Sequence, residues 1–158
     1  MAPEAVTKSE RLMKKTVLVV DDDASVRESL GKVLRQENYE TVLAADGQEA
    51  VEGFEKAKID LLLLDLGLPI KNGWDTFERI TGENPFVPII IITGQAHKHP
   101  VAVAAGAGAL MEKPLDVPRL LQTMQELLAE PPEARLRRLC GYTQDVRHVP
   151  GVSQSAGT

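Results

Sequence analysis

The sequence has a single cysteine and no long apolar segment, and each shortage narrows what the protein can be. Because Cys140 is the only cysteine among 158 residues, no intrachain disulfide can form, which suits a reducing compartment. The longest apolar runs, Leu61–Leu64 and Val87–Ile92, are far shorter than the roughly 20 residues that cross a bilayer. Residues 1–15 have scattered charges and lack the apolar core of a signal peptide. We therefore expect a soluble, cytoplasmic protein without a membrane contact.

Positive charge is also scarce. The formal net charge is -5 at pH 7, so binding to nucleic acid through many phosphate contacts is disfavoured. Hydrophobic residues make up 43% of the chain and charged residues 26%, a composition typical of globular proteins rather than disordered ones. A length of 158 residues accommodates one domain with short extensions. We expect a single globular domain without a nucleic-acid partner.

The chain divides into three parts. Residues 1–15 are polar and without pattern, so we expect a flexible lead-in. Residues 16–129 alternate short apolar runs with amphipathic stretches and form the expected domain. Residues 130–158 begin with one glutamate and two prolines and are expected to be a tail that can hold one short helix. This tail is too small for a DNA-binding domain of usual size, so output goes through protein contacts or the chain is part of a longer protein.

The middle part predicts an α/β fold. The expected strands are Thr16–Val20, Thr41–Ala44, Leu61–Leu64, Ile89–Ile92 and a weaker fifth, Ala109–Met111. Two of these runs lack polar alternation, which is typical of parallel strands covered on both faces. Apolar residues recur at helical spacing between the strands, and Asp46 followed by Glu49 predicts a helix capping box. Repeated strand–helix alternation predicts an open parallel sheet with helices on both faces.

Residues suited to phosphate chemistry stand at the ends of the expected strands. Ligands of open α/β sheets bind at the carboxyl ends of the strands. Carboxylates gathered there would repel one another, and a divalent cation removes that conflict. All-oxygen ligation by few carboxylates is typical of Mg²⁺. The strand-end residues are Asp21, Asp22 and Asp23 after the first strand, Asp65 at the end of the third, Thr93 at the end of the fourth and Lys113 after the fifth.

The same residues predict an aspartyl phosphate. A carboxylate beside bound magnesium can attack phosphorus as a nucleophile, and Asp65 is the candidate. During transfer, a cation and a nearby ammonium offset charge on the equatorial oxygens. Lys113 can supply that ammonium, and the Thr93 hydroxyl can donate a hydrogen bond to the transferred group.

In combination, these motifs resemble the receiver domain of bacterial two-component response regulators, the CheY-like superfamily. The resemblance covers about residues 16–129 and is specific because four motifs occur in order, each just past an expected strand. It implies a flavodoxin-like, doubly wound, five-stranded parallel sheet with strand order 2-1-3-4-5. The motifs are Val19-Val20-Asp21-Asp22-Asp23, Asp65-Leu66-Gly67-Leu68-Pro69 with Asn72-Gly73, Ile92-Thr93-Gly94 and Lys113-Pro114.

The resemblance assigns a role to each matching residue. Asp21 and Asp22 match the acidic pair that helps to hold Mg²⁺, Asp65 the phosphoacceptor, and Gly67 the residue whose backbone carbonyl ligates the metal. Asp23 lies one place beyond the pair and is expected to be a helix N-cap.

Thr93 matches the family's switch hydroxyl and Lys113 its phosphate-contacting lysine. The bond between Lys113 and Pro114 is expected to be cis. The implied phosphoryl donor is a sensor histidine kinase or a phosphotransfer protein, and the implied output is a phosphorylation-dependent contact with a protein target, with homodimerisation an option. The domain would catalyse only its own phosphorylation and dephosphorylation.

The chain departs from the family pattern at two places. Leu110 stands three positions before the lysine, where receivers often have an aromatic residue, so coupling to the output face uses another side chain or is weakened. The segment between Thr93 and Gly106 is short and alanine-rich, which predicts a poorly packed fourth helix. Because Gly67 leaves its side of the acceptor open, we expect an acyl phosphate that is not strongly shielded, with Gln95 able to orient water.

Two other functions remain as alternatives. A phosphohydrolase of haloacid-dehalogenase type also uses a strand-end aspartate, but it needs a second aspartate two positions on, where this chain has Gly67. A degenerate receiver could act as a binding or dimerisation module without phosphorylation. The complete set of acidic pair, acceptor, threonine and lysine argues against this second alternative, whereas Leu110 and the short fourth helix favour it.

Several other polar residues have simpler interpretations. His97 and His99 are expected to be exposed loop residues rather than a metal site, Cys140 an ordinary thiol, and Trp74 a packing residue. A basic patch in the tail is interpreted as a solvated helix face, with docking onto a partner as the alternative. It consists of Arg135, Arg137 and Arg138.

Overall fold

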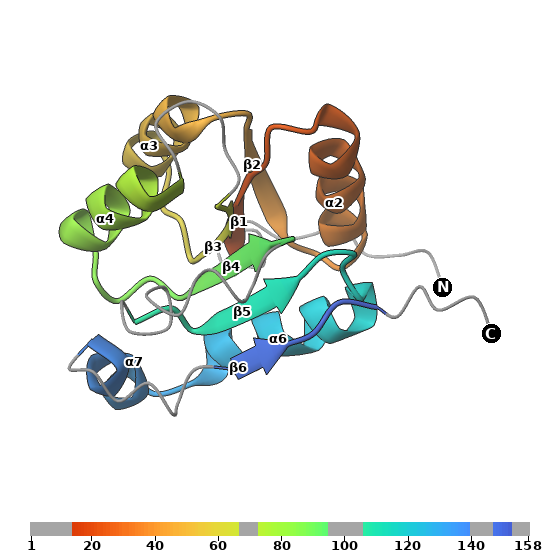
Figure 1. Cartoon of the computed structure of the whole chain (residues 1–158). Coiled ribbons are helices and arrows are strands. Elements are labelled where there is room, and N and C mark those ends of the chain that lie inside the picture. The colour runs from red at the N-terminus through yellow and green to blue at the C-terminus, as the bar shows by residue number, and fades with distance from the viewer. Residues whose placement is uncertain (1–13, 67–72, 95–105, 140–146, 153–158) are drawn as a thin grey trace, which may run out of the picture.

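The computed structural model describes residues 14–66, 73–94, 106–139 and 147–152. These residues form one parallel sheet of six strands in the order β2-β1-β3-β4-β5-β6, flanked by helices (Figure 1). The strands are β1 (Thr16–Val20), β2 (Glu40–Ala44), β3 (Leu61–Asp65), β4 (Ile89–Thr93), β5 (Ala109–Glu112) and β6 (Arg147–Val149). The helices are α2 (Ala24–Gln36), α3 (Gly47–Lys56), α4 (Gly73–Glu83), α6 (Val117–Ala129) and α7 (Pro132–Leu139).

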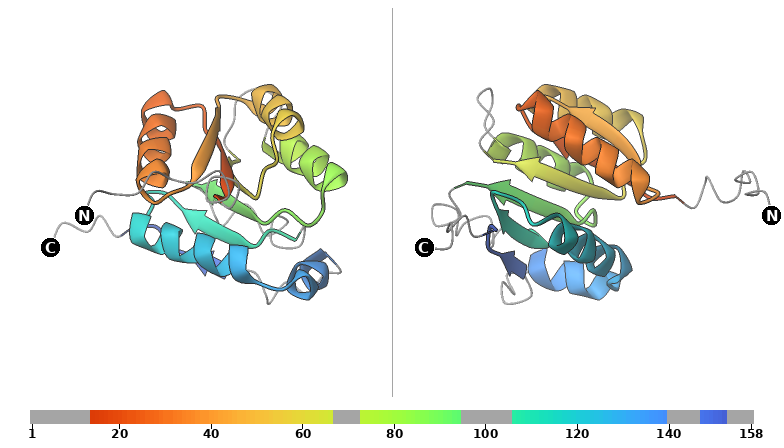
Figure 2. Two further views of the ribbon diagram at one scale, coloured as in Figure 1. Left: turned by 180° about the vertical axis from the view of Figure 1, so that it is seen from behind. Right: turned by 90° about the vertical axis from the view of Figure 1, so that its right-hand side faces the viewer.

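The two faces of the sheet bury two separate apolar clusters, because successive side chains of a strand point to opposite faces. In β1, Leu18 and Val20 pack in one cluster, with residues of α3 and α4. Val17 and Val19 pack in the other, with residues of α2 and α6. Figure 2 shows these helix pairs on opposite sides of the sheet. Every residue of the central strands β3 and β4 is buried, which explains why their sequences lack polar alternation.

Helix starts are fixed by aspartate side chains, as predicted. Asp23 precedes α2 and accepts hydrogen bonds from the amides of Ser25 and Val26 at 2.9 and 3.3 Å. Asp46 precedes α3 and accepts from the amide of Glu49 at 2.8 Å. The Glu49 carboxylate accepts from the amide of Ala45 at 2.6 Å, one residue earlier than in a standard capping box. These contacts satisfy amides that the first helical turn leaves unpaired.

The predicted fold class and the order of the five predicted strands are confirmed, and the sheet has a sixth strand that the sequence did not predict. β6 pairs in parallel with β5, so that Leu110 lies opposite His148 and Met111 opposite Val149. A strand of three residues with a basic residue and a histidine has too little apolar pattern to be recognised. The short helix predicted in the tail is present as α7.

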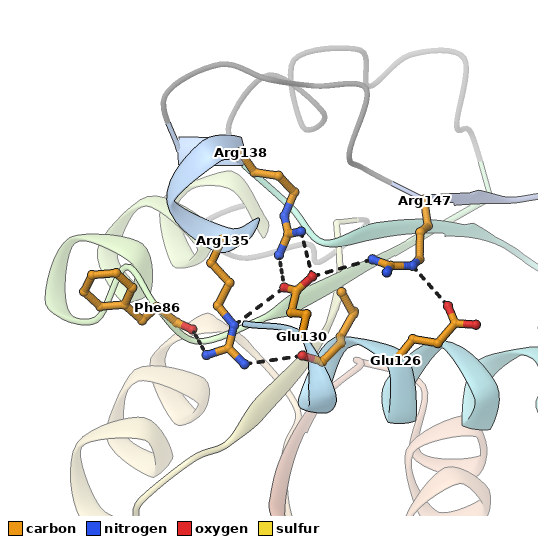
Figure 3. A network of polar contacts seen from close by, with 7 residues as sticks. Phe86, Glu126, Glu130, Arg135, Arg138 and Arg147 are labelled. Atoms are coloured by element: carbon orange, nitrogen blue, oxygen red, sulfur yellow. Dashed lines mark hydrogen bonds and ion pairs between the residues drawn. The ribbon is translucent and has the colours of Figure 1, made fainter. Parts of the chain in front are cut away.

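An ion-pair cluster connects α7 and β6 to the end of α6 (Figure 3). We call it the Glu130 cluster, and its members are Glu130, Arg135, Arg138 and Arg147. Arg138 contacts both carboxylate oxygens of Glu130 through its two terminal nitrogens. Nε of Arg135 lies 3.6 Å from this carboxylate and Nη1 of Arg147 lies 3.8 Å from it. Arg147 also contacts Glu126 at 3.1 Å.

The predicted solvated face in the tail is therefore wrong for Arg138, whose exposed fraction is only 2%. Its partner Glu130 is almost as well covered, with 7% of the side chain exposed. Arg135 extends the contact to the turn between α4 and β4, because its Nη1 donates to the backbone carbonyl of Phe86 at 2.6 Å. The sequence gives no sign of this burial, because the counter-charge Glu130 lies outside α7, two residues before its start.

Several predictions fall outside the described residues. The expected fourth helix lies in the range 95–105, together with Gln95, His97 and His99. Gly67 and Cys140 also lie outside the described residues. Across the part of the chain that is described, no helix is both long enough and apolar enough to cross a membrane.

Candidate functional site

The predicted site residues meet at the carboxyl edge of the sheet. Asp21 follows β1 directly, Asp65 is the last residue of β3, Thr93 is the last residue of β4 and Lys113 follows β5. Backbone hydrogen bonds between neighbouring strands align these strand ends at one edge of the sheet. The amide of Asp21 donates to the carbonyl of Ala44 at 3.1 Å, and that of Lys113 to the carbonyl of Thr93 at 2.9 Å. The described site residues therefore lie at the ends of paired strands or directly after them.

Three carboxylates converge at this edge. One oxygen from each of Asp21, Asp22 and Asp65 lies within 4.8 Å of the other two. Asp21 and Asp65 are buried, with exposed fractions of 2% and 4%, whereas Asp22 is exposed. Within the described residues, the cluster thus has a covered base formed by Asp21 and Asp65 and an accessible side at Asp22.

Lys113 is the cation that faces this cluster. Its ammonium Nζ donates to Asp65 Oδ2 at 3.0 Å and lies 3.6 Å from Asp21 Oδ2. Burial acts to lower the pKa of Lys113, but the hydrogen bond and charge of Asp65, followed by the charge of Asp21, outweigh burial and raise it. Lys113 is therefore held in its charged form beside the predicted phosphoacceptor.

Asp21 has one satisfied and one unsatisfied oxygen. Its Oδ1 accepts from the amide of Asp23 at 2.9 Å. Its buried Oδ2 has no hydrogen-bond donor among the described residues, although the Lys113 ammonium faces it at 3.6 Å. Burial raises the pKa of this carboxyl group above its ordinary value, and the Asp23 amide and the Lys113 charge oppose the rise. A buried carboxylate oxygen without a donor is costly and is the kind of atom that a metal ion would satisfy.

The residues present fit a divalent cation. Three carboxylates against one ammonium leave a formal charge of minus two, which one divalent ion balances. All the side-chain ligand atoms offered are hard oxygens, the type that Mg²⁺ prefers, and their small number leaves coordination positions for water or phosphate oxygens. Gly67, whose carbonyl was predicted as a further ligand, lies outside the described residues.

Thr93 and Leu110 occupy neighbouring strands beneath the site. Thr93 is buried, with 4% exposed, and pairs with Glu112 across the sheet. Leu110, which stands where receivers often have an aromatic residue, is also 4% exposed and packs in the cluster under α3 and α4. An aliphatic side chain thus occupies this buried position. That coupling to the output face uses another side chain or is weakened stays a prediction.

Two further details connect the site to its surroundings. The bond between Lys113 and Pro114 is cis, as predicted. Arg27, in the first turn of α2, donates from Nη1 to the backbone carbonyl of Asp21 at 2.8 Å. Arg27 was not predicted from the sequence, because a side-chain contact with a backbone carbonyl six residues away leaves no motif. Asp23 points instead to its helix, and the hydroxyl of Ser25 and the amides of Val26 and Ser25 lower its pKa.

Comparison with known proteins gives one consistent result. The family model of the response regulator receiver domain matches residues 17–125. The transcriptional regulatory protein PdtaR of Mycobacterium tuberculosis is 34% identical over 122 residues, which cover 75% of this chain and 59% of PdtaR. The chain therefore spans somewhat more than half the length of this relative.

Solved structures agree. A CheY-like receiver domain protein from Methanospirillum hungatei matches with a TM-score of 0.69 and 31% identity, covering 73% of this chain and 94% of that one. TrrA of Thermotoga maritima, solved in complex with Mg²⁺ and BeF, matches with a TM-score of 0.66 and 29% identity, covering 72% of this chain and 98% of that one. By sequence family, strand order and strand-end residues, this chain belongs to the response regulator receiver domain family.

Proposed function

We propose that this receiver domain accepts a phosphoryl group on Asp65 in a magnesium-dependent reaction and signals through a phosphorylation-dependent protein contact. The observation that supports the proposal most directly is the position of Asp65. Its carboxylate lies within 4.8 Å of two other carboxylates and 3.0 Å from an ammonium group, at the carboxyl edge of the sheet. A nucleophile, a cation site and a charge-stabilising lysine are thereby combined in one small region.

In the proposed reaction, an oxygen of Asp65 attacks the phosphorus of the donor. A new bond forms between that oxygen and phosphorus, and the bond between phosphorus and the donor's leaving atom breaks, so the electron pair departs with the donor. For a phosphohistidine donor the leaving atom is a ring nitrogen. The histidine side chain keeps the electron pair of the broken bond and, with one proton taken up, departs as a neutral imidazole. Lys113 Nζ, 3.0 Å from Asp65 Oδ2, is placed to neutralise charge on the transferred group.

Asp21, Asp22 and Asp65 would hold the magnesium ion, with the Gly67 carbonyl as the fourth proposed ligand. When bound, the ion supplies electrostatic stabilisation of the phosphoryl oxygens. The Thr93 hydroxyl is proposed to donate a hydrogen bond to the transferred group, because the threonine ends the strand next to Asp65.

The proposed phosphoryl donor is a sensor histidine kinase or a phosphotransfer protein in the cytoplasm. The chain has a net charge of -5, and its output is proposed to be a contact with a protein target rather than with nucleic acid, with homodimerisation as one form of that contact. PdtaR is named as a transcriptional regulatory protein, and its additional length gives it sequence that this chain does not match. Apart from its own phosphorylation and dephosphorylation, the domain is proposed to have no enzymatic activity.

The test is phosphorylation by acetyl phosphate and Mg²⁺, followed by mass measurement of the intact protein. The expected result is a mass gain of one phosphoryl group, which disappears with a chelator and in Asp65→Asn. The matched control is Asp23→Asn, because Asp23 lies next to the acidic pair but caps α2, and asparagine caps a helix about as well as aspartate. Absence of the mass gain in the wild type, or its persistence in Asp65→Asn, would contradict the proposal and favour a phosphorylation-independent binding module.

A further inference from the structure

The chain after α7 returns to the functional site and contacts the residues on both sides of Lys113. The amide of Gly151 donates to Glu112 Oε2 at 3.2 Å, and the amide of Val152 donates to the carbonyl of Pro114 at 3.0 Å. His148 Nε2 lies 3.1 Å from Glu112 Oε1. Residues 148–152 thus contact the residue before Lys113 and the residue after it.

This C-terminal segment, residues 147–152, is itself held in place by the sheet. The amide of Arg147 donates to the carbonyl of Gly108 at 3.1 Å, and Val149 is buried in the apolar cluster under α2 and α6, with 5% exposed. Arg147 also contacts Glu126 at 3.1 Å. Because it pairs with β5 and buries an apolar side chain, the segment forms a firm support for the backbone at residues 112–114.

The closest approach is between Gly151 and Lys113. A Cβ atom at position 151 would lie 2.7 Å from the Lys113 carbonyl oxygen, 3.0 Å from its carbonyl carbon and 3.2 Å from the Glu112 carbonyl oxygen. These are backbone atoms, which cannot rotate away as a side chain can. Only glycine therefore permits the segment to lie against the Lys113 peptide unit without displacement.

The position of this peptide unit matters because Lys113 reaches the site from it. The Lys113 amide is fixed on one side by the Thr93 carbonyl at 2.9 Å, and its carbonyl faces Gly151 on the other. From this backbone, the side chain places Nζ 3.0 Å from Asp65 Oδ2. A backbone shift of a fraction of an ångström at residue 113 changes that distance, and catalysis is sensitive to displacements of this size.

We propose that residues 147–152 are positioning residues for Lys113, with Gly151 as the critical contact. The C-terminal segment then belongs functionally to the phosphorylation site although none of its side chains touches the acceptor. This inference rests on the proposed function of Asp65 and Lys113. Because coupling between two sites is reciprocal, occupation of the site should in turn alter how firmly the segment is held.

The test compares Gly151→Ala with Gly82→Ala in the full chain. Gly82 is the matched control, since a Cβ there would contact no described atom outside its own stretch of α4 within 4 Å. Figure 1 shows α4 on the far side of the sheet from β6. The rate of Asp65 phosphorylation by acetyl phosphate with Mg²⁺ is measured for each protein. We expect Gly151→Ala to lower this rate about three- to tenfold and Gly82→Ala to leave it unchanged.

A double-mutant cycle separates positioning of Lys113 from a general structural effect. In a Lys113→Met background the lysine is gone, so Gly151→Ala should produce no further loss of rate. Exchange of the Lys113 amide with solvent gives a second readout, because that amide is bonded to Thr93, and it should be faster in Gly151→Ala than in the control.

The outcomes distinguish the two proposals. If the wild type is not phosphorylated, the proposed function fails; if it is phosphorylated and Gly151→Ala reacts at the control rate, only the positioning role fails. An undiminished effect of Gly151→Ala in the Lys113→Met background would also overturn that role. If the Lys113→Met protein reacts too slowly to measure, amide exchange decides, and protection equal to that of the wild type overturns the proposal.

Discussion

Two charged clusters of this molecule have opposite charge ratios, and they are suited to different purposes. At the carboxyl edge of the sheet, three carboxylates face one ammonium group. In the Glu130 cluster, one carboxylate faces three guanidinium groups. The buried atoms that lack a hydrogen bond within the described part of the chain follow this imbalance, because they are a carboxylate oxygen in the first cluster and guanidinium nitrogens in the second.

Solvent access explains the difference in purpose. In the first cluster Asp22 is exposed, so the excess negative charge is open to a cation from solution. In the second, Glu130 and Arg138 are covered by the chain itself, and their contact joins α7 to the end of α6. The covered pair therefore connects two helices, whereas the other two arginines of the Glu130 cluster remain partly exposed, with 20% of the Arg135 side chain and 35% of the Arg147 side chain accessible. Arg147 has a second counter-charge in Glu126.

The largest predicted effect on stability follows the loss of the carboxylate in the Glu130 cluster. Glu130→Gln leaves the buried Arg138 guanidinium without a counter-charge and turns an amide NH₂ toward its donors. We expect the free energy of unfolding to fall by about 3 kcal/mol, measured by urea denaturation. Glu133→Gln is the control, because Glu133 is exposed at the start of α7 and its loss should cost less than about 0.5 kcal/mol. Equal effects of the two variants would contradict the role given to the Glu130 cluster.

The next largest effect concerns cation binding at the cluster of Asp21, Asp22 and Asp65. A divalent ion that binds only the folded protein stabilises it, by about 1.4 kcal/mol at a free concentration ten times the dissociation constant. We therefore expect Mg²⁺ to raise the thermal midpoint of the wild type, measured with Na⁺ at equal ionic strength as the reference. An unchanged midpoint at millimolar Mg²⁺ would argue against the magnesium site.

A smaller effect, opposite in sign to that of Glu130→Gln, is expected for Asp21→Asn. Without metal, an ionised Asp21 is costly, because burial raises its pKa in the folded protein and because Asp22 and Asp65 lie close by. The asparagine can still accept from the Asp23 amide, so the metal-free protein should gain about 1 kcal/mol in urea denaturation with a chelator present. The same variant should lose most of its stabilisation by Mg²⁺. A loss of stability with chelator would show that the negative charge of Asp21 is not in excess.

The smallest effect is expected for Asp23→Ser, which removes a negative charge one residue from the acidic pair. Serine is also a good helix cap, and Asp23 is directed to the amides of α2. The free energy of unfolding should change by less than about 0.5 kcal/mol, and the Mg²⁺-dependent rise of the thermal midpoint should remain. If Mg²⁺ raised the thermal midpoint of Asp23→Ser much less than that of the wild type, Asp23 would have to be counted among the metal ligands.

The cluster of three aspartates with Lys113 was predictable from the sequence, whereas the Glu130 cluster was not, for a physical reason. Parallel strands end at one edge of a sheet, so residues just after buried apolar runs must meet there, as Asp21, Asp65 and Lys113 do. The strands themselves are recognisable because full burial requires continuous apolar runs. The predicted positions therefore follow from topology alone, without knowledge of side-chain packing.

The Glu130 cluster and β6 depend on packing between segments that have no such rule. Arg138 is buried because α7 lies against the end of α6, and its sequence neighbours give no sign of this. β6 has only one buried side chain, Val149, and its pairing with β5 is decided by the available edge rather than by its own pattern. The contact of Gly151 with Lys113 likewise requires knowledge of where the chain returns to the sheet.

The placement of β6 has a further consequence for how the domain behaves among its neighbours. Arg147 and Val149 occupy the outer side of β5, whose backbone N–H and C=O groups would otherwise be free to pair with a strand of another molecule. A shortened chain ending at residue 129 would uncover this backbone together with the apolar surface that Val149 covers. Such a chain is expected to self-associate with rising concentration, whereas the full chain has its own C-terminal residues in that place.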